Sequence, residues 1–241
     1  MKKMKMRSAI AMIELIFSIV VMGIVLMSAP MLVSIAAKSG YVAMQQESIA
    51  AASSEIGMIL TRQWDEGNTD FNKTAPILRT TNGDSGLDEN VPTGRRAGTP
   101  SSSQRSFFTS VGGDLDASTN FTAEADFDDI DDYNGNNTQL KLYNSETTGA
   151  DIGDYVDTDI NIQTTVSYME DDASNGISYV NGGPTLTFND PFNRVTAATS
   201  NIKSVNVRLT TTNTATELNK TIILNAFSCN IGTYELKERN Y

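Results

Sequence analysis

Five aspartates cluster in the middle of the chain and have the chemistry to bind a metal ion: Asp126, Asp128, Asp129, Asp131 and Asp132. Clustered carboxylate oxygens are the ligands that Ca²⁺ takes in proteins. An EF-hand loop is excluded, because placing Gly135 at its sixth position puts Lys141 at the twelfth, where an acid is needed. Two interpretations stay open. One is a Ca²⁺ site of another geometry, and the other is a solvated acidic turn that packs onto the protein through regularly spaced apolar side chains: Phe127, Ile130 and Tyr133.

The residues that most nucleophilic catalysis needs are missing. The chain of 241 residues contains no histidine, which excludes Ser-His and Cys-His nucleophile pairs and His-based metal sites. Carboxylates alone could serve a glycosidase, but this aspartate cluster is local in sequence and typical of a turn. Cys229 is the single cysteine, so no disulfide forms within the chain, and its strand-like surroundings predict a buried thiol. We therefore expect a protein that is not an enzyme.

The charge of the chain argues against nucleic acid as a direct partner. There are 18 basic and 29 acidic residues, and the formal net charge is −11. Phosphate binding requires clustered Lys or Arg. Arg95, Arg96 and Arg105 form the one notable basic group before the C-terminal strands, and their turn-rich surroundings predict a solvated loop.

A single acid, Glu14, stands near the start of a long apolar segment. Residues 10–37 include only six outside the apolar set: Glu14, Ser18, Gly23, Ser28, Pro30 and Ser34. The segment exceeds the roughly 20 residues that a membrane-spanning helix needs, and the basic residues before it predict a cytoplasmic N-terminus. A carboxylate in a membrane costs up to about 3.5 kcal/mol and usually has a partner. The segment contains no cation, so we expect that partner to be an amino terminus or a group on another chain.

The residues around Glu14 resemble the type IV prepilin family. Residues 9–16, Ala-Ile-Ala-Met-Ile-Glu-Leu-Ile, follow its pattern of a small residue, the cleavage point, and an apolar stretch with an acid at the fifth position. Ala9 stands where that family usually has Gly. The resemblance implies cleavage between Ala9 and Ile10 by prepilin peptidase and N-methylation of Ile10. It also implies that Glu14 pairs with the amino terminus of a neighbouring pilin subunit at the inner-membrane assembly platform.

The elements that position these residues divide the chain into five parts. They are a leader (1–9), a transmembrane or filament-core helix (10–37), an amphipathic continuation of that helix (38–64), a loop (65–104) and a β-rich head (105–241). Pro30 is expected to weaken the helix locally. Beyond residue 40 an apolar stripe predicts packing on the head, and its members are Tyr41, Met44, Ile49, Ala52, Ile56, Ile59 and Leu60.

The C-terminal half has the alternation and residue types of strands. We predict strands over 140–143, 159–169, 177–180, 185–188, 202–212 and 221–228, a hairpin tip at 181–184, and one short strand over 75–80. Alternate apolar positions predict an antiparallel sheet with one face covered by the long helix. The fold class is therefore α+β, and the resemblance implies a pilin fold.

A second resemblance bears on the type of filament. Residues 127–135, Phe-Asp-Asp-Ile-Asp-Asp-Tyr-Asn-Gly, are similar to a segment of minor prepilins from mannose-sensitive haemagglutinin (MSHA) type pili. The alternatives are a type II secretion pseudopilin, a family that often holds Ca²⁺, and a membrane-anchored binding domain that never polymerises. The resemblance implies a single-pass protein of the bacterial inner membrane before assembly, and a periplasmic or cell-surface filament afterwards. After cleavage the chain would keep 14 basic and 29 acidic residues.

Overall fold

The computed structural model describes most of the chain, in two compact units. The described residues are 6–69, 75–90, 92–100, 102–103, 105–107, 116–119, 121, 126–142, 158–172, 194–211 and 219–232. The first unit covers Met1–Glu47 and the second, here called the head, covers Ser48–Tyr241. The predicted strands 177–180 and 185–188 and the hairpin tip 181–184 lie outside the described residues.

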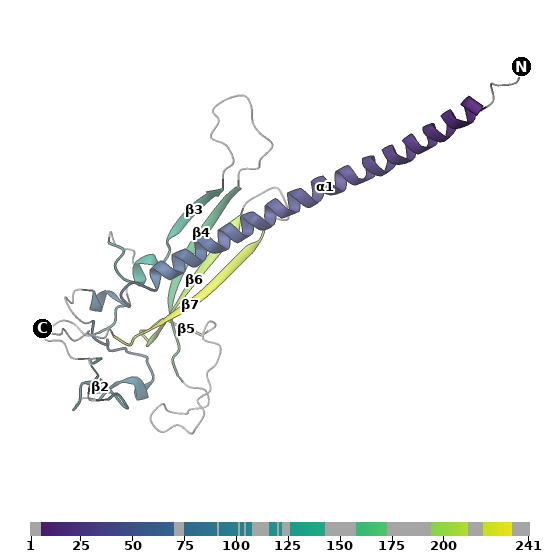
Figure 1. The fold of residues 1–241 in the computed structure, drawn as a ribbon. Coiled ribbons are helices and arrows are strands. Elements are labelled where there is room, and N and C mark those ends of the chain that lie inside the picture. The colour runs from purple at the N-terminus through teal and green to yellow at the C-terminus, as the bar shows by residue number, and fades with distance from the viewer. Residues whose placement is uncertain are drawn as a thin grey trace, which may run out of the picture. The chain divides into compact units, whose positions relative to one another are not determined.

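Helix α1 runs over Met6–Ile59 and passes through Pro30 without interruption (Figure 1). It ends five residues before the predicted Trp64, in a tight turn in which Thr61 and Arg62 donate to carbonyls three residues back, at 3.1 and 3.0 Å. Gln63 then joins the acidic segment instead of the helix, because its carbonyl accepts from the Ile130 amide at 3.0 Å. Tertiary pairing therefore sets the end of the helix.

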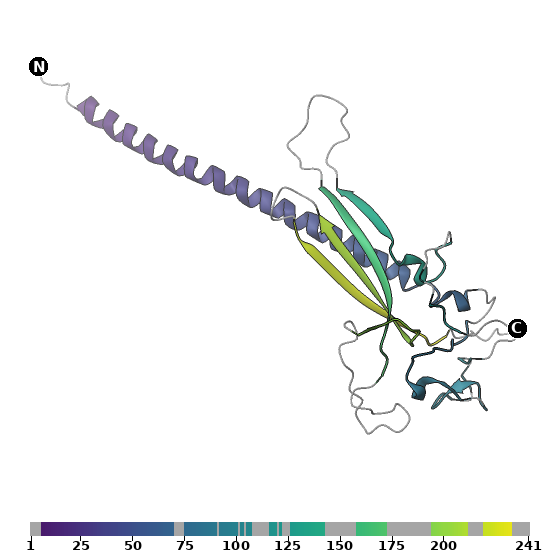
Figure 2. The ribbon, with the colours of Figure 1, turned by 180° about the vertical axis from the view of Figure 1, so that it is seen from behind.

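The head is built on an antiparallel sheet (Figures 1 and 2). Its strands are β3 (Asn137–Leu142), β4 (Thr158–Met169), β6 (Ile202–Thr211) and β7 (Thr221–Cys229), hydrogen-bonded in that order. The short β5 (Val195–Thr196) pairs with the end of β4 and was not predicted. The structure confirms the α+β class and the predictions for β4, β6 and β7, and it begins β3 three residues earlier than predicted.

One face of the sheet is apolar and covered, as the alternation predicted. Buried side chains on β4 and β6 include Ile160, Ile162, Val166, Val205, Val207 and Leu209, each no more than 5% exposed. Covering such a side chain stabilises the fold by about 1.5–3 kcal/mol. The last turns of α1 lie on this face, where Ala52 and Ile59 are fully buried and Thr164 donates to Glu55 at 2.8 Å. Ile49 and Leu60, which were predicted in the buried stripe, are exposed.

The segments between α1 and the sheet contain short elements. They are the 3₁₀ helices η1 (Glu66–Asn68), η2 (Ser85–Leu87) and η3 (Asp131–Tyr133) and the two-residue strands β1 (Glu89–Asn90) and β2 (Arg95–Arg96), which pair with each other. The strand predicted over 75–80 is absent, and only Arg79 there forms an isolated bridge, to Asp116. Ile77 and Leu78 are nevertheless buried in the head.

Candidate functional site

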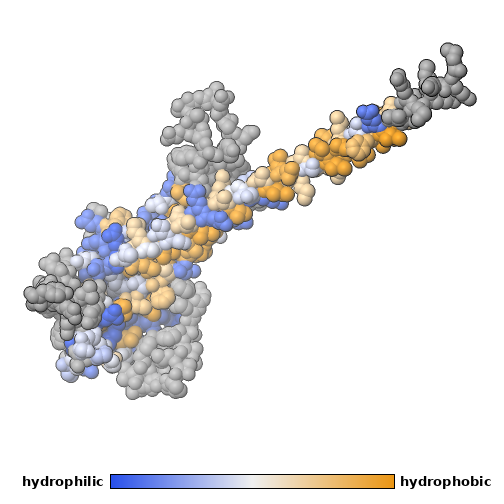
Figure 3. Space-filling model, in the orientation of Figure 1, coloured by the Kyte–Doolittle hydropathy of each residue, from blue (hydrophilic) through white to orange (hydrophobic). Residues whose placement is uncertain are grey.

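The N-terminal part of α1 carries the predicted processing and assembly residues. Ala9 and Ile10 lie in its first turns, although their side chains are outside the described ones. Glu14 is exposed, and among the described residues its carboxylate makes no hydrogen bond or ion pair. Every side chain from Ala11 to Gly40 is exposed, including large apolar ones such as Leu26 and Met27. This helix is long and apolar enough to cross a membrane, and its surface is apolar along most of this length (Figure 3).

The predicted cation ligands in the head do not converge on an empty site. Asp129 precedes η3, and its Oδ1 accepts from the amides of Asp131 and Asp132 at 2.7 and 3.1 Å. Asp132 turns back to accept from the amides of Asp128 and Asp129. Asp126 and Asp128 are exposed. Among the described residues, no group of three or more acidic, Cys or His side chains is placed to hold a metal ion. The acidic residues do form a turn, but it is not solvated as predicted, because Asp129, Asp131 and Asp132 are buried. The Ca²⁺ site stays a prediction.

The apolar residues of this turn hold it on the head. Ile130 and Tyr133 are buried, while Phe127 is 39% exposed and lies edge-on to Tyr133 at 5.0 Å between ring centroids. Tyr133 also accepts a hydrogen bond from Arg62 at 3.3 Å. The predicted spacing of three therefore matches one helical turn with two anchoring side chains.

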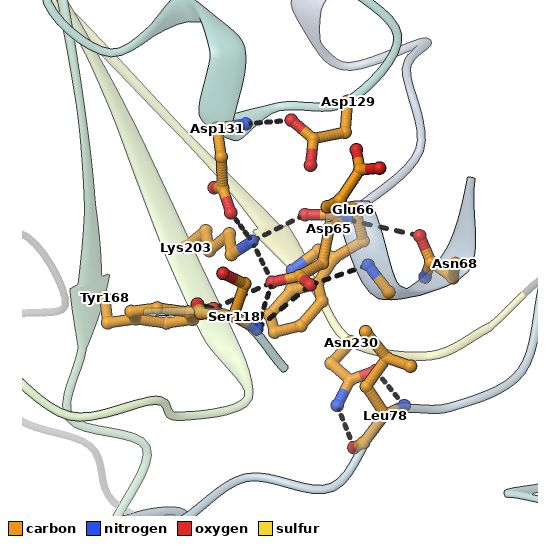
Figure 4. Close-up of polar contacts among 12 residues, drawn as sticks. Asp65, Glu66, Asn68, Leu78, Ser118, Asp129, Asp131, Tyr168, Lys203 and Asn230 are labelled. Atoms are coloured by element: carbon orange, nitrogen blue, oxygen red, sulfur yellow. Dashed lines mark hydrogen bonds and ion pairs between the residues drawn. The ribbon is translucent and has the colours of Figure 1, made fainter. Parts of the chain in front are cut away.

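A buried lysine provides the cation for this part of the head (Figure 4). The Lys203 side chain has no exposed surface, and its ammonium donates to Asp65 at 2.7 Å, to Asp131 at 2.6 Å and to the Trp64 carbonyl at 2.8 Å. Three acceptors satisfy its three N–H donors. The Nζ atom also lies 4.2 Å from the Trp64 ring centroid and 5.0 Å from that of Tyr168, within cation–π range. We call Lys203, Asp65 and Asp131 the charged centre.

Asp65 has the most hydrogen-bond partners in the charged centre. Its Oδ1 accepts from the amides of Gly67 and Ser118 at 3.0 and 3.1 Å. Its Oδ2 accepts from Lys203, from the Tyr168 hydroxyl at 2.9 Å and from the Ser118 amide at 3.2 Å. The carboxylate also caps η1. In return, the Asp65 amide donates to the side-chain oxygen of Asn68 in η1. These contacts fix the carboxylate between α1 and the sheet.

Burial changes the proton affinity of the acids near Lys203. Desolvation raises the pKa of Asp131 to about 8, although the neighbouring ammonium opposes the rise. Desolvation likewise raises the pKa of Asp129 to about 6, against the lowering effect of the Asp132 amide and Lys203. Burial and the Asp65 charge raise the pKa of Tyr168, which keeps its hydroxyl proton. Burial also raises the pKa of the Cys229 thiol. This thiol is half-buried, whereas the sequence predicted a buried one.

Sequence reasoning missed Asp65, Lys203 and the role of Arg96. Lys203 shares the strand alternation of Val205, Val207 and Leu209, so its position on the covered face was visible in the pattern. Arg96 was predicted to lie in a solvated loop, but its guanidinium donates to the carbonyls of Leu87 and Asn230 and to the side chain of Asn201. The prediction for Arg96 failed because the carbonyls that it binds, in η2 and just after β7, are brought to it only by the tertiary fold.

Comparison of the chain with protein-family models, with curated proteins and with solved structures found no match.

Proposed function

We propose that this chain is a structural filament subunit, a minor type IV pilin of the MSHA-like kind with a pilin fold. Prepilin peptidase would cut between Ala9 and Ile10, and α1 would move from the inner membrane into the core of the filament. The proposal rests on the residues that resemble the prepilin pattern and on the exposure of the helix that carries them.

The single observation that carries the proposal is an apolar helix without cover. From Ala11 to Gly40 every side chain is exposed, and large apolar residues there are 43–84% exposed. An exposed apolar surface of this extent marks contact with a membrane or with other protein. Lipid would cover the helix before assembly, and the same helix of neighbouring subunits would cover it afterwards.

The Glu14 carboxylate favours movement of this helix from the lipid into the filament. Its carboxylate has no described partner within the chain, and inside a membrane such a group costs up to about 3.5 kcal/mol. Cleavage after Ala9 would create a positive amino group on Ile10. Pairing of Glu14 with that group on a neighbouring subunit would satisfy both charges and recruit the helix into the filament.

We propose a pilus and not the alternative, a secretion pseudopilus, because of the sequence similarity carried by the acidic turn. Residues 127–135 carry the similarity to MSHA-type minor pilins, and in the head they form η3 and a turn packed through Ile130 and Tyr133.

Substitution of Glu14 tests the proposal. We expect Glu14→Ala to leave cleavage intact and to lower the amount of subunit in sheared filaments, by about tenfold for each 1.4 kcal/mol of pairing lost. Ser18→Ala, on the same exposed part of α1, is the control and should assemble normally. Immunoblots of filament and membrane fractions give the ratio, and normal incorporation of Glu14→Ala contradicts the proposal.

A further inference from the structure

The charged centre holds a lysine in the geometry of an amide-forming site. Lys203 has no exposed surface, and its Nζ atom contacts Oδ2 of Asp65 at 2.7 Å (Figure 4). A nitrogen that is hydrogen-bonded to a carboxylate oxygen is a neighbour of the carboxyl carbon, which it would have to approach to form an amide. Rings of Trp64, Tyr168 and Phe121 surround the Nζ atom at 4.2–5.9 Å and exclude water from it. Such dry surroundings favour a condensation that releases water.

Hydrogen bonds hold the Asp65 carboxyl group in place for attack by an amine. The amides of Gly67 and Ser118 both donate to its Oδ1, at 3.0 and 3.1 Å. Two backbone N–H groups on one oxygen form an oxyanion hole, which stabilises the negative charge that develops there when a nucleophile adds to the carbon. The Ser118 amide is shared with the other oxygen, Oδ2, at 3.2 Å. Oδ2 also accepts from Lys203 and Tyr168 and is the oxygen that would leave.

Asp131 is placed to carry protons for this reaction. Its Oδ2 lies 2.6 Å from the Lys203 Nζ, and its Oδ1 is buried and has no hydrogen-bond partner among the residues that the structure describes. A buried carboxylate oxygen without a hydrogen-bond partner destabilises the fold, so its presence in a native structure calls for an explanation. Transient protonation during the reaction would supply that reason.

We propose that Lys203 and Asp65 form an intramolecular amide bond, with Asp131 as the proton carrier. The bond is independent of the proposed function, because it concerns the head alone. It would join β6 to the segment after α1 across 138 residues of chain and give the head a covalent link that its single cysteine cannot provide.

The reaction balances without a co-reactant. Asp131 in its charged form takes one proton from the Lys203 ammonium, and the resulting amine adds to the carboxyl carbon of Asp65. A second proton leaves the nitrogen as the carbon–Oδ2 bond breaks, and the two protons depart with Oδ2 as water. Asp131 ends as it began, one positive and one negative charge disappear, and nothing is oxidised or reduced.

The surrounding hydrogen bonds accommodate the product. The Tyr168 hydroxyl has one proton and two acceptors, Asp65 Oδ2 and the Ser118 carbonyl at 2.6 Å, so it keeps a partner when Oδ2 leaves. The amide N–H that remains on Lys203 can donate to Asp131 or to the Trp64 carbonyl. Both Gly67 and Ser118 keep the Oδ1 acceptor, now the amide oxygen.

Peptide mass analysis of the full-length protein, purified from membranes in detergent, tests the proposal. Trypsin should release residues 63–73 joined to residues 195–208, lighter by one water than the two peptides together and uncut after Lys203. Recovery of free peptides cut after Lys203 from the folded protein overturns the proposal. A link from Lys203 to residues 106–141, which contain Asp131, overturns the assignment of Asp65 as acceptor.

Matched variants test the roles of the residues. Lys203→Arg should abolish the linked peptide, whereas the exposed Lys220→Arg should leave it at the level of the unsubstituted chain. General acid–base groups contribute about 10²–10⁴-fold to rates, so little linked peptide is expected from Asp131→Asn at a fixed time after synthesis. The control is the exposed Asp159→Asn. If the Asp131→Asn protein has native circular dichroism and full linkage, the role of Asp131 is overturned. The peptide analysis of the unsubstituted chain tests whether the bond exists, even if the variants misfold.

Discussion

At the residue scale, the Lys203 ammonium, as it stands before the proposed amide forms, contacts two carboxylates and can neutralise the charge of only one. Asp65 and Asp131 contact it directly, and Asp129 lies close enough to influence Asp131 electrostatically. Two buried carboxylates and one ammonium are costly to desolvate, and only their mutual contacts and hydrogen bonds offset that cost. Removing the cation therefore affects the head far more than the loss of one side chain would suggest.

Lys203→Ala is expected to lower the free energy of unfolding of the head by about 3–5 kcal/mol, because it leaves buried charges without a partner. Lys220→Ala, at an exposed position of the same residue type, should change it by less than about 0.5 kcal/mol. Urea unfolding followed by Trp64 fluorescence measures both. Equal midpoints for the two variants contradict the account.

Two buried acids of the η3 segment, Asp129 and Asp131, predict that stability falls as pH rises. Asp131 and Asp129 have native pKa values of about 8 and about 6, above the ordinary 3.8 of an unfolded aspartate. The native state therefore binds more protons than the unfolded state between these values, and the contribution of each group is lost as pH rises from about 4 to its native pKa. Melting temperatures at pH 5 and pH 8 measure the trend. The Asp131→Asn variant should show a smaller difference between the two, and an unchanged difference would contradict this assignment.

The same residues predict that Ca²⁺ leaves the head unaffected. Asp129 and Asp132 already accept backbone N–H groups, and Lys203 supplies the cation for Asp131. We expect equal melting temperatures of the full chain with millimolar Ca²⁺ and with a chelator. A ligand present at 100 times its dissociation constant adds about 2.7 kcal/mol of stability, so a clear upward shift with Ca²⁺ would restore the calcium interpretation.

At the element scale, the end of α1 is fitted closely to the sheet. Ala52 is fully buried on the covered face, one helical turn from the Glu55 that bonds Thr164 on β4. Ala52→Leu inserts side-chain volume where there is none to spare and should cost about 1–3 kcal/mol. Ser54→Leu, on the exposed side of the same turn, is the control. Chemical denaturation compares the two, and equal stability would mean that the helix does not pack here as described.

How much of these elements the sequence predicts depends on how local their causes are. Period-two alternation in 159–169 and 202–212 predicted β4 and β6 and their buried faces, because one covered face imposes that pattern directly. The end of α1 and the setting of Arg96 depend on partners more than 60 residues away, Ile130 and Asn230, which no local pattern contains. The charged centre could be predicted from the sequence only in part. Lys203 occupied a core position in the alternation, but Asp65 became its partner only through the fold.

At the scale of the whole molecule, the two units have opposite surfaces. The first unit presents apolar side chains along α1, and the head carries its acids and its packed sheet. An apolar helix joined to a water-compatible head suits a subunit that is stored in a membrane and then assembled through its helix. The proposed assembly through Ile10 and Glu14 depends on cleavage of the leader.

The most direct test is N-terminal peptide analysis of membrane-extracted protein from cells with and without prepilin peptidase. The account predicts that the chain begins at N-methylated Ile10 when the peptidase is present and at the basic leader when it is absent. Retention of the leader in both cells would contradict the account and leave a membrane-anchored domain that does not polymerise.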